Sequence, residues 1–439
     1  MTHNAINRRA FLGSSAAAAM AAGCGDSGSA SAGAAASQAR NPVGVDELQP
    51  AFSEAEYQDR LRRVRERMAQ DNIDLLWVML PEGMCYLHGM ILNWYQANSP
   101  KGWIPRSGTA VHVDHDKLIH FDSGSHQGTM DAITVVKDFR VLRGGMDFVI
   151  AELQAEGWLG GTVGIDRWSY RPPPVLAEPL EAAFTNAGCT VVDSSDVMRD
   201  VRLIKSPEEI AVMDDAGRIC DAGHEAIRTA LHPGVTELEM YGEALRGMFA
   251  AGGGTPALIC GVRNPRGSHA CPSRKVLKQG DALFADLCGV AHRYHANTSR
   301  TYWLGEPPAE VVDNYAKNAG SFAVISEHGR AGTPIGEVCD ALREYYDGVG
   351  LDPRGFGYDL GISFPPDWVG PFVWSFGRGN DGDTFSTIGL GDNPDDWVFR
   401  DGMVTNYESL MGESLMQSFV IEPEGARLLS NLPIEISVV

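Results

Sequence analysis

The chain has 439 residues, with 36 Lys and Arg against 57 Asp and Glu, which gives a formal net charge of −21 at pH 7. A surface this acidic argues against nucleic acid and anionic lipid as partners and suits a cationic or zwitterionic small molecule, although it can also serve solubility alone. Hydrophobic residues make up 44% of the chain, as in an ordinary globular protein, and the length favours two domains. No apolar stretch is long enough to predict a membrane-spanning helix.

Residues 1–23 have the pattern of an export signal. Asn7–Leu12 reads Asn-Arg-Arg-Ala-Phe-Leu, a twin-arginine motif, and an Ala-rich segment follows it. Ala21-Ala22-Gly23-Cys24 resembles the cleavage box of bacterial lipoproteins, which predicts that Cys24 is lipidated; a plain cleaved signal with an incidental cysteine is the alternative. Residues 24–47 are predicted to be a flexible tether, because they are rich in Gly, Ser and Ala. We therefore expect a periplasmic protein that meets the membrane only through a lipid anchor.

Residues 48–200 have the pattern of a smaller α/β domain. A charged amphipathic stretch predicts a helix over Ser53–Gln70. Apolar runs predict strands at Leu75–Leu80, Val111–Phe121 and Val163–Ile165. The segment Pro81–Gly89 resembles the Pro-Glu-Asn-x-x-Tyr-Leu-x-Gly turn of pita-bread amino-terminal domains, which implies a turn here. Arg171–Pro174 is expected to be a stiff turn.

Residues 201–439 are expected to form the second domain, after a linker at Val201–Lys205. Ser206-Pro207-Glu208-Glu209 opens a helix, because it has a capping Ser, a Pro in the first turn and a Glu three residues after the cap. Further helices are predicted at Glu237–Ala250, Glu310–Glu327 and Ile335–Gly348. The Gly- and Asp-rich residues 376–396 show no period and predict a solvated insertion.

The polar side chains that point to chemistry gather between His269 and Tyr302. Apolar or Thr- and Tyr-rich runs predict two strands here, Ala282–Leu287 and Tyr294–Leu304. Asp286 lies inside the first strand, where an ionised carboxylate is costly unless it is paired or used. Asn297 follows it by eleven residues and Arg300 by three more, and an ion pair between Asp286 and Arg300 is the structural alternative.

These residues resemble the signature of the pita-bread family of creatinase and aminopeptidase P. The matching positions are Gly280–Asp281, Asp286, Asn297 and Arg300–Thr301. The resemblance implies an α+β fold in which helices cover a curved antiparallel sheet, preceded by a creatinase-type α/β domain. It also implies a homodimer, since the amino-terminal domain of one subunit closes over the active site of the other.

The chain departs from the metal-dependent members at the positions of their five metal ligands. Asp286 and Glu408 are kept, whereas the other three positions carry Asn297, Tyr358 and Met416. A second family histidine, seven residues after the first, is replaced by Pro365. An amide is a much poorer ligand than a carboxylate for hard cations. The resemblance therefore implies neither a dinuclear metal centre nor another cofactor, although two carboxylates could still hold one cation weakly.

The metal-independent branch of the family is the better match. The segment Gly357–Trp368, with its Pro-Pro-Asp-Trp end, and Arg293-Tyr294-His295 are similar to segments of ectoine hydrolases. The resemblance implies that His269 moves a proton, with Asp286 and Glu408 as the other catalytic residues. The expected substrate-binding residues are Tyr358, His295, Asn297, Arg300, Asp367 and Trp368.

The sequence thus predicts an exported, metal-independent hydrolase of a C–N bond in a small amidine, cyclic amidine or amide. Three alternatives stay open. His269 and a carboxylate could instead abstract a proton and eliminate a leaving group, as in a lyase. The chain could also be a solute-binding lipoprotein without catalysis, or a metal-dependent peptidase of the Xaa-Pro type.

Overall fold

The computed structural model describes residues 49–92, 107–167, 174–256, 261–263, 271–351, 358–362, 373–376, 384–386, 398–409 and 414–439. The chain divides into two units, Met1–Arg40 and Asn41–Val439, and all described residues belong to the second. The expected export signal, tether and lipidation site at Cys24 lie outside the described residues and stay predictions. Among the described helices, none is long and apolar enough to cross a membrane.

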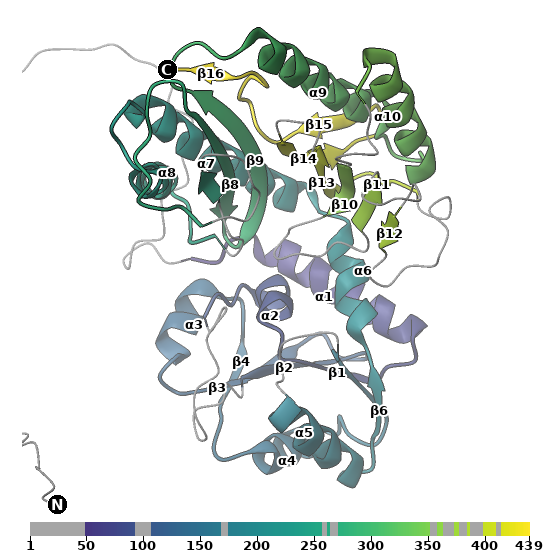
Figure 1. Cartoon of the computed structure of the whole chain (residues 1–439). Helices are drawn as coiled ribbons and strands as arrows, with labels where there is room; N and C mark the ends of the chain where they lie inside the picture. The colour runs from purple at the N-terminus through teal and green to yellow at the C-terminus, as the bar shows by residue number, and fades with distance from the viewer. Residues whose placement is uncertain are drawn as a thin grey trace, which may run out of the picture. The chain divides into compact units, whose positions relative to one another are not determined.

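The first part of the described chain contains a mixed sheet with strand order β4-β3-β2-β1-β5-β6 (Figure 1). Its strands are β1 Leu75–Val78, β2 Gly108–His112, β3 Leu118–Asp122, β4 Asp138–Val141, β5 Thr162–Ile165 and β6 Thr190–Asp193. β2 pairs antiparallel with β1 and β3, whereas the β1–β5, β5–β6 and β3–β4 pairs are parallel. The smaller α/β domain that the sequence predicts is therefore confirmed.

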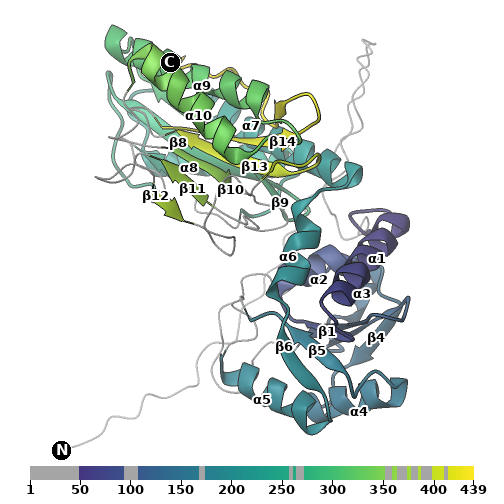
Figure 2. The ribbon, with the colours of Figure 1, turned by 90° about the vertical axis from the view of Figure 1, so that its right-hand side faces the viewer.

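The helices around this sheet are α1 Glu54–Gln70, α2 Pro81–His88, α3 Gln127–Ile133, α4 Met146–Glu156, α5 Pro174–Asn186 and α6 Ser195–Leu203. α1 begins where the sequence predicts, because the Ser53 hydroxyl accepts a hydrogen bond from the Glu56 backbone N–H at 3.1 Å. α1 contacts α2 and α6 (Figure 2), and its Leu61 and Val64 also pack in one apolar cluster with Leu76 of β1.

Three local predictions were wrong. Pro81–Gly89 is not a turn: Pro81–His88 forms α2, and Gly89 is its C-cap with φ of 91°. Pro is common at the first position of a helix, and Gly is common just after its end. Val111–Phe121 is not one strand, because Asp114 and Asp116 lie in the tight connection between β2 and β3. The expected linker Val201–Lys205 is helical as far as Leu203, where α6 ends.

The second part contains a large sheet with strand order β12-β11-β10-β13-β14-β9-β8-β7 (Figure 1). The strands of this path are β7 Gly261–Arg263, β8 Ala282–Ala291, β9 Tyr294–Trp303, β10 Tyr358–Ile362, β11 Val373–Phe376, β12 Thr384–Ser386, β13 Val404–Ser409 and β14 Leu415–Ile421. All of its neighbours pair antiparallel. Two short strands join it: β15 Ala426–Leu428 pairs with β14, and β16 Ser437–Val438 pairs with β9.

β8 is longer than the sequence predicts, because it continues beyond Leu287 to Ala291. The two residues that turn the chain into β9 are His292 and Arg293, both with positive φ, at 47° and 72°. Two positive φ angles in a two-residue turn match the right-handed twist of the flanking strands. This turn contains no glycine, although glycine is the residue that most readily adopts a positive φ.

Four helices cover one face of the large sheet: α7 Pro207–Ala230, α8 Glu237–Ala250, α9 Ala309–His328 and α10 Ile335–Val349. Figure 2 shows α9 and α10 along one side of strands β10, β13 and β14. α7 lies so close to β8 that a Cβ atom at Gly289 would stand 2.1 Å from the Ala216 carbonyl oxygen. Helices on one face of an antiparallel sheet are the α+β arrangement that the resemblance implies, and it is confirmed.

Candidate active site

The face of a strand on which each residue lies follows from the core contacts. Leu283, Ala285 and Leu287 of β8 pack in one apolar cluster with Cys220 and Ile227 of α7. Because side chains alternate between the faces of a strand, Asp286 lies on the opposite face, away from the helices. On β13, Tyr407 packs in a cluster with residues of α9 and α10, which places Glu408 on that same helix-free face.

Asn297 of β9 stands beside Asp286 and donates two hydrogen bonds. Its Nδ2 lies 2.7 Å from Asp286 Oδ1 and 3.0 Å from the Leu287 carbonyl oxygen. The amide orientation follows from this contact, because the flipped amide would put its oxygen against two acceptors. Asn297 Oδ1 then faces away and accepts from Asn406 Nδ2 at 3.3 Å.

Asn406 of β13 continues this row of hydrogen bonds, which starts at Asp286 and Asn297, as far as the second carboxylate, Glu408. Its Nδ2 lies 3.2 Å from Glu408 Oε1, while its Oδ1 accepts from the Ser418 hydroxyl at 3.1 Å. Ser418 Oγ in turn accepts from the backbone N–H of Asn297 at 3.0 Å. Two amides and one hydroxyl therefore connect Asp286 with Glu408 across strands β8, β9, β14 and β13.

This row of hydrogen bonds contains two residues that the sequence analysis did not single out, Asn406 and Ser418. One signal was available for Asn406: it precedes Glu408 by two residues in a strand, so that both share a face. Ser418 gave no comparable signal, since its contact depends on the pairing of β13 with β14, where Asn406 stands opposite Ser418.

The two carboxylates are buried with N–H donors beside them. Asp286 is 4% exposed and Glu408 is 8% exposed. A buried carboxylate is costly unless hydrogen bonds or opposite charge compensate it, and each of these accepts at least one amide N–H. The arrangement concentrates acceptor oxygens on one face, which suits a ligand that carries N–H groups and positive charge.

His295 lies on the same face of β9 as Asn297, two residues before it, and is buried. Burial lowers the pKa of His295 to about 3, with Arg293 acting in the same direction. The ring is therefore neutral at pH 7 and offers one donor and one acceptor nitrogen. Its predicted role in substrate binding stays a prediction, with the neutral imidazole as the species that would act.

Arg300 is not brought together with the other predicted residues. It follows Asn297 by three positions in a regular strand, which places its side chain on the opposite face. Its guanidinium donates to the backbone carbonyls of Ser299, Leu432 and Pro433 at 2.7 to 2.8 Å. These bonds hold the segment before β16, and they supply a structural role in place of an ion pair with Asp286.

Three predicted residues, His269, Asp367 and Trp368, lie outside the described residues. The backbone of Tyr358 is described: it begins β10 and stands opposite Ser409, the neighbour of Glu408, in the pairing of β10 with β13. Their roles stay predictions.

The side chains at the expected metal positions fit a metal pair poorly. Asn297 turns an amide nitrogen, not an oxygen, toward Asp286. Met416, directly opposite Glu408 in the pairing of β13 with β14, supplies a buried thioether, whereas hard divalent cations prefer oxygen ligands. Within the described ranges, no three His, Cys, Asp or Glu side chains are grouped so that they could hold a metal ion.

Comparison with known proteins agrees with this fold. The sequence profile of the metallopeptidase family M24 matches residues 211–427, and that of the creatinase/prolidase N-terminal domain matches residues 60–204. The chain therefore belongs to the pita-bread family of creatinase and aminopeptidase P.

Individual relatives include enzymes of more than one kind. The ectoine hydrolase of Halomonas elongata is 27% identical over 344 residues, which are 72% of this chain and 83% of that protein. A probable dipeptidase PepE of Mycobacterium bovis is 29% identical over 196 residues, 44% of this chain and 52% of that protein. The solved structure of an Xaa-Pro dipeptidase from Bacillus anthracis has a TM-score of 0.67 at 17% identity, and the match covers 87% of this chain and 100% of that one. That last likeness shows the fold alone.

Proposed function

We propose that the protein is a metal-independent hydrolase that cleaves a C–N bond in a small cationic or zwitterionic amidine, cyclic amidine or amide. The observation that carries the proposal is the row of amides between Asp286 and Glu408. This row places hydrogen-bond donors on both carboxylates, and it has the amide of Asn297 where the family resemblance expects a metal-binding aspartate. The similarity to the ectoine hydrolase of Halomonas elongata supports a cyclic amidine as the substrate.

The proposed reaction needs one water molecule. Water adds to the amidine carbon and gives one proton to a carboxylate, and this proton passes to the leaving nitrogen as the C–N bond breaks. The second proton of the water is released as the carbonyl forms and ends on the free amine. Asp286 and Glu408 hold the cationic N–H groups of the substrate, and one of them activates the water as general base. His269 delivers the proton to the leaving nitrogen, the role that the family resemblance gives it.

A second candidate is peptide hydrolysis at a prolyl bond. The likeness of the fold to an Xaa-Pro dipeptidase and the similarity to a probable dipeptidase favour it. The amide at Asn297 and the thioether at Met416 count against it, because they replace carboxylate oxygens that a metal pair would need.

Export and assembly are further proposals. The twin-arginine motif and the box around Cys24 support a periplasmic lipoprotein, and the resemblance to dimeric pita-bread enzymes supports a homodimer.

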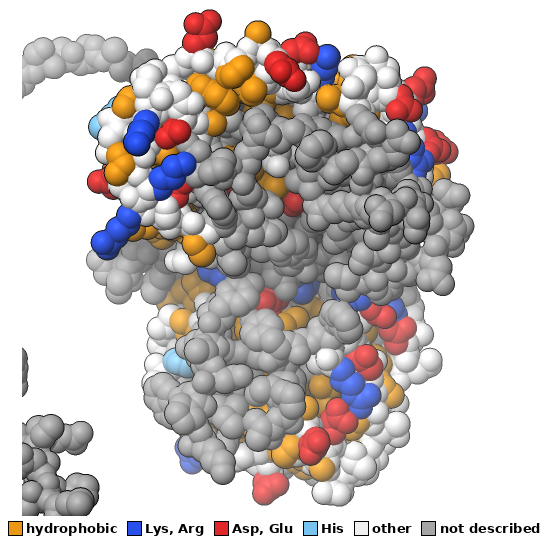
Figure 3. Space-filling model, viewed as in Figure 1, with side chains coloured by type: hydrophobic (Ala, Val, Ile, Leu, Met, Phe, Trp, Pro, Cys, Tyr) orange, Lys and Arg blue, Asp and Glu red, His pale blue; other side chains and the backbone are white. Residues whose placement is uncertain are grey.

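The net charge of −21 supports a cationic substrate. Figure 3 shows acidic and basic side chains interspersed over the described surface of that face, so the charge is spread out there.

The proposal is tested by assaying the purified protein, without added metal, against ectoine, creatine-like guanidines and Xaa-Pro dipeptides in ¹⁸O-labelled water. We expect turnover of an amidine or guanidine with one labelled oxygen in the product. An unlabelled, unsaturated product would indicate elimination, and turnover of the dipeptides alone would indicate a peptidase; either result contradicts the proposal. The His269→Ala variant is the control for a binding protein, which would keep its affinity and have no turnover to lose.

A further inference from the structure

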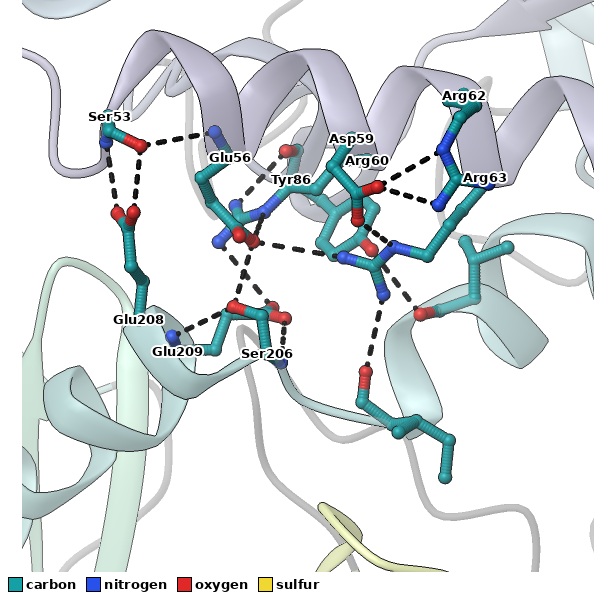
Figure 4. Close-up of polar contacts among 12 residues, drawn as sticks. Ser53, Glu56, Asp59, Arg60, Arg62, Arg63, Tyr86, Ser206, Glu208 and Glu209 are labelled. Atoms are coloured by element: carbon teal, nitrogen blue, oxygen red, sulfur yellow. Dashed lines mark hydrogen bonds and ion pairs between the residues drawn. The ribbon is translucent and has the colours of Figure 1, made fainter.

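Arg60 of α1 is a fully buried cation at the contact between α1 and the start of α7 (Figure 4). The side chain is 0% exposed. Its Nε donates to Glu56 Oε1 at 2.7 Å, its Nη1 donates to the Tyr86 carbonyl oxygen at 3.2 Å, and its Nη2 lies 3.7 Å from Glu209 Oε1. Figure 4 shows these groups converging between the two helices, with Ser206 linked to Glu56.

Aromatic rings enclose the guanidinium on the remaining sides. The Arg60 Cζ atom lies 3.9 Å from the ring centroid of Phe52 and 4.8 Å from that of Tyr86. A cation without water is costly unless carboxylates and ring faces compensate it, so removing one partner of such a pair leaves the other uncompensated. The placement of Arg60 is therefore tightly determined by its neighbours.

Glu209 is the carboxylate that links this cation to the large sheet. Its Oε2 accepts from the Ser206 backbone N–H at 2.9 Å and so caps α7, while its Oε1 accepts from the Tyr294 hydroxyl at 2.6 Å. Burial, together with the negative charge of Glu209, holds the pKa of Tyr294 well above its ordinary value. The hydroxyl therefore keeps its proton and remains a donor to a charged acceptor, which is a strong kind of hydrogen bond.

Tyr294 is the first residue of β9, and the strand carries His295 and Asn297 immediately after it. The ring of Phe52, which precedes α1, packs edge-on against the Tyr294 ring with 5.6 Å between centroids. Both the ring and the hydroxyl of Tyr294 are thus held by the group of residues around Arg60. Any displacement of this tyrosine would be passed to the strand that places the Asn297 amide on Asp286.

We propose that Arg60, Glu209 and Tyr294 form a positioning unit. The unit fixes the residues at the start of β9, next to the β8–β9 turn, and with them the side-chain amide of Asn297. The unit touches none of the reacting groups. It acts through the strand, by tying β9 to helix α1 and to the cap of α7. The inference concerns the geometry of the site and holds whichever substrate the protein hydrolyses.

The test is hydrogen–deuterium exchange of the full chain, comparing wild type with Tyr294→Phe and Arg60→Met. Tyr294→Phe removes only the hydroxyl, so it reports on the unit even if Arg60→Met folds poorly. Arg62→Met is the matched control, because Arg62 is on the same helix in exposed ion pairs with Asp59 and Glu66, a kind of contact that contributes little. The exchange rate of amides in peptides from α10 serves as the reference for unfolding of the whole protein.

We expect the β9 amides from Tyr294 to Asn297 to exchange at least tenfold faster in Tyr294→Phe, with α10 unchanged and Arg62→Met like wild type. A β9 exchange rate within twofold of wild type would overturn the proposal. An equal acceleration in β9 and α10 would overturn it as well, because the hydroxyl would then support overall stability and not the position of the strand. No substrate is needed, so a failed hydrolase assay leaves this test intact.

Discussion

Glu408→Gln and Asp286→Asn are each expected to lower turnover by about 10²–10⁴, the range that a positioned acid or base contributes. Glutamine can still accept from Asn406 Nδ2, so the row of hydrogen bonds toward Asn297 is kept while the charge is lost. For Asp286→Asn, the new amide can keep its oxygen toward Asn297 Nδ2. Both substitutions thus remove charge at nearly constant shape. Steady-state kinetics with the substrate found by the labelled-water screen measures the effect.

Glu422→Gln is the control for this pair. Glu422 is an exposed carboxylate paired with Arg427 just after β14, so its replacement removes the same charge outside the site. Its kinetics are expected to match wild type. Thermal unfolding of all three variants separates a loss of chemistry from a loss of fold. If Glu408→Gln or Asp286→Asn kept wild-type turnover, the two carboxylates would not be the catalytic pair.

Acid is expected to destabilise the folded protein steeply below about pH 6.5, the ordinary pKa of histidine. Burial holds the pKa of His224 and His295 at about 3 and that of His88 well below its ordinary value. At a pH between the lowered pKa in the folded state and the ordinary pKa, each of these histidines binds a proton in the unfolded chain but not in the folded chain. Stability is therefore fully present above the ordinary pKa and is lost as pH falls toward the folded value.

The size of the effect follows from the number of protons. One proton changes the free energy of unfolding by about 1.4 kcal/mol per pH unit, so three such histidines give roughly 4 kcal/mol per unit over this window. Burial raises the pKa of Asp166 and Asp221, which oppose the trend near the lower end. Since domains are stable by about 5–15 kcal/mol, a loss of roughly 4 kcal/mol per pH unit below about pH 6.5 places unfolding between about pH 5 and pH 3.

Urea unfolding at pH 7.5, 6.5, 5.5 and 4.5 measures this prediction. His224→Gln is the informative variant: in wild type, Nε2 of His224 bonds the Thr298 carbonyl oxygen and Nδ1 bonds the Tyr302 hydroxyl, both at 2.9 Å. The variant is expected to be less stable at pH 7.5. The slope of its unfolding free energy against pH is expected to be smaller by the contribution of about one proton, about 1.4 kcal/mol per pH unit. A free energy of unfolding that stays constant from pH 7.5 to 5.5 would contradict the account.

Elements whose signals are local could be predicted from the sequence. α7 begins at the capping box of Ser206 and Glu209, and α8 has the bounds Glu237–Ala250 that the sequence predicts. The error at Pro81–Gly89 is local too: a segment that resembles a turn of pita-bread amino-terminal domains forms a two-turn helix, with Pro81 at its start and Gly89 as its cap. Single positions of this kind are compatible with both structures, and packing against neighbours decides between them.

The site was harder to predict, because its contacts join residues that are far apart in the chain. Asp286 and Asn297 are eleven residues apart and could be paired from the hairpin pattern. Asn406 is 109 residues from its partner Asn297, and that contact depends on which strands are neighbours in the sheet. Arg300 shows the limit of spacing alone: three positions from Asn297 suggested one polar group, but in a strand an odd spacing means the opposite face.

The central claim is that side chains, not cations, hold Asp286 and Glu408 in place. The most direct measurement is turnover after exhaustive chelation, with bound metal quantified on the same sample, for wild type and for Asn297→Asp. We predict that wild type keeps its full rate with far less than one metal ion per chain. Asn297→Asp is predicted to lose activity, because it sets a second negative charge against Asp286. Wild-type turnover that disappears on chelation and returns with added Mn²⁺ or Co²⁺ would contradict the account.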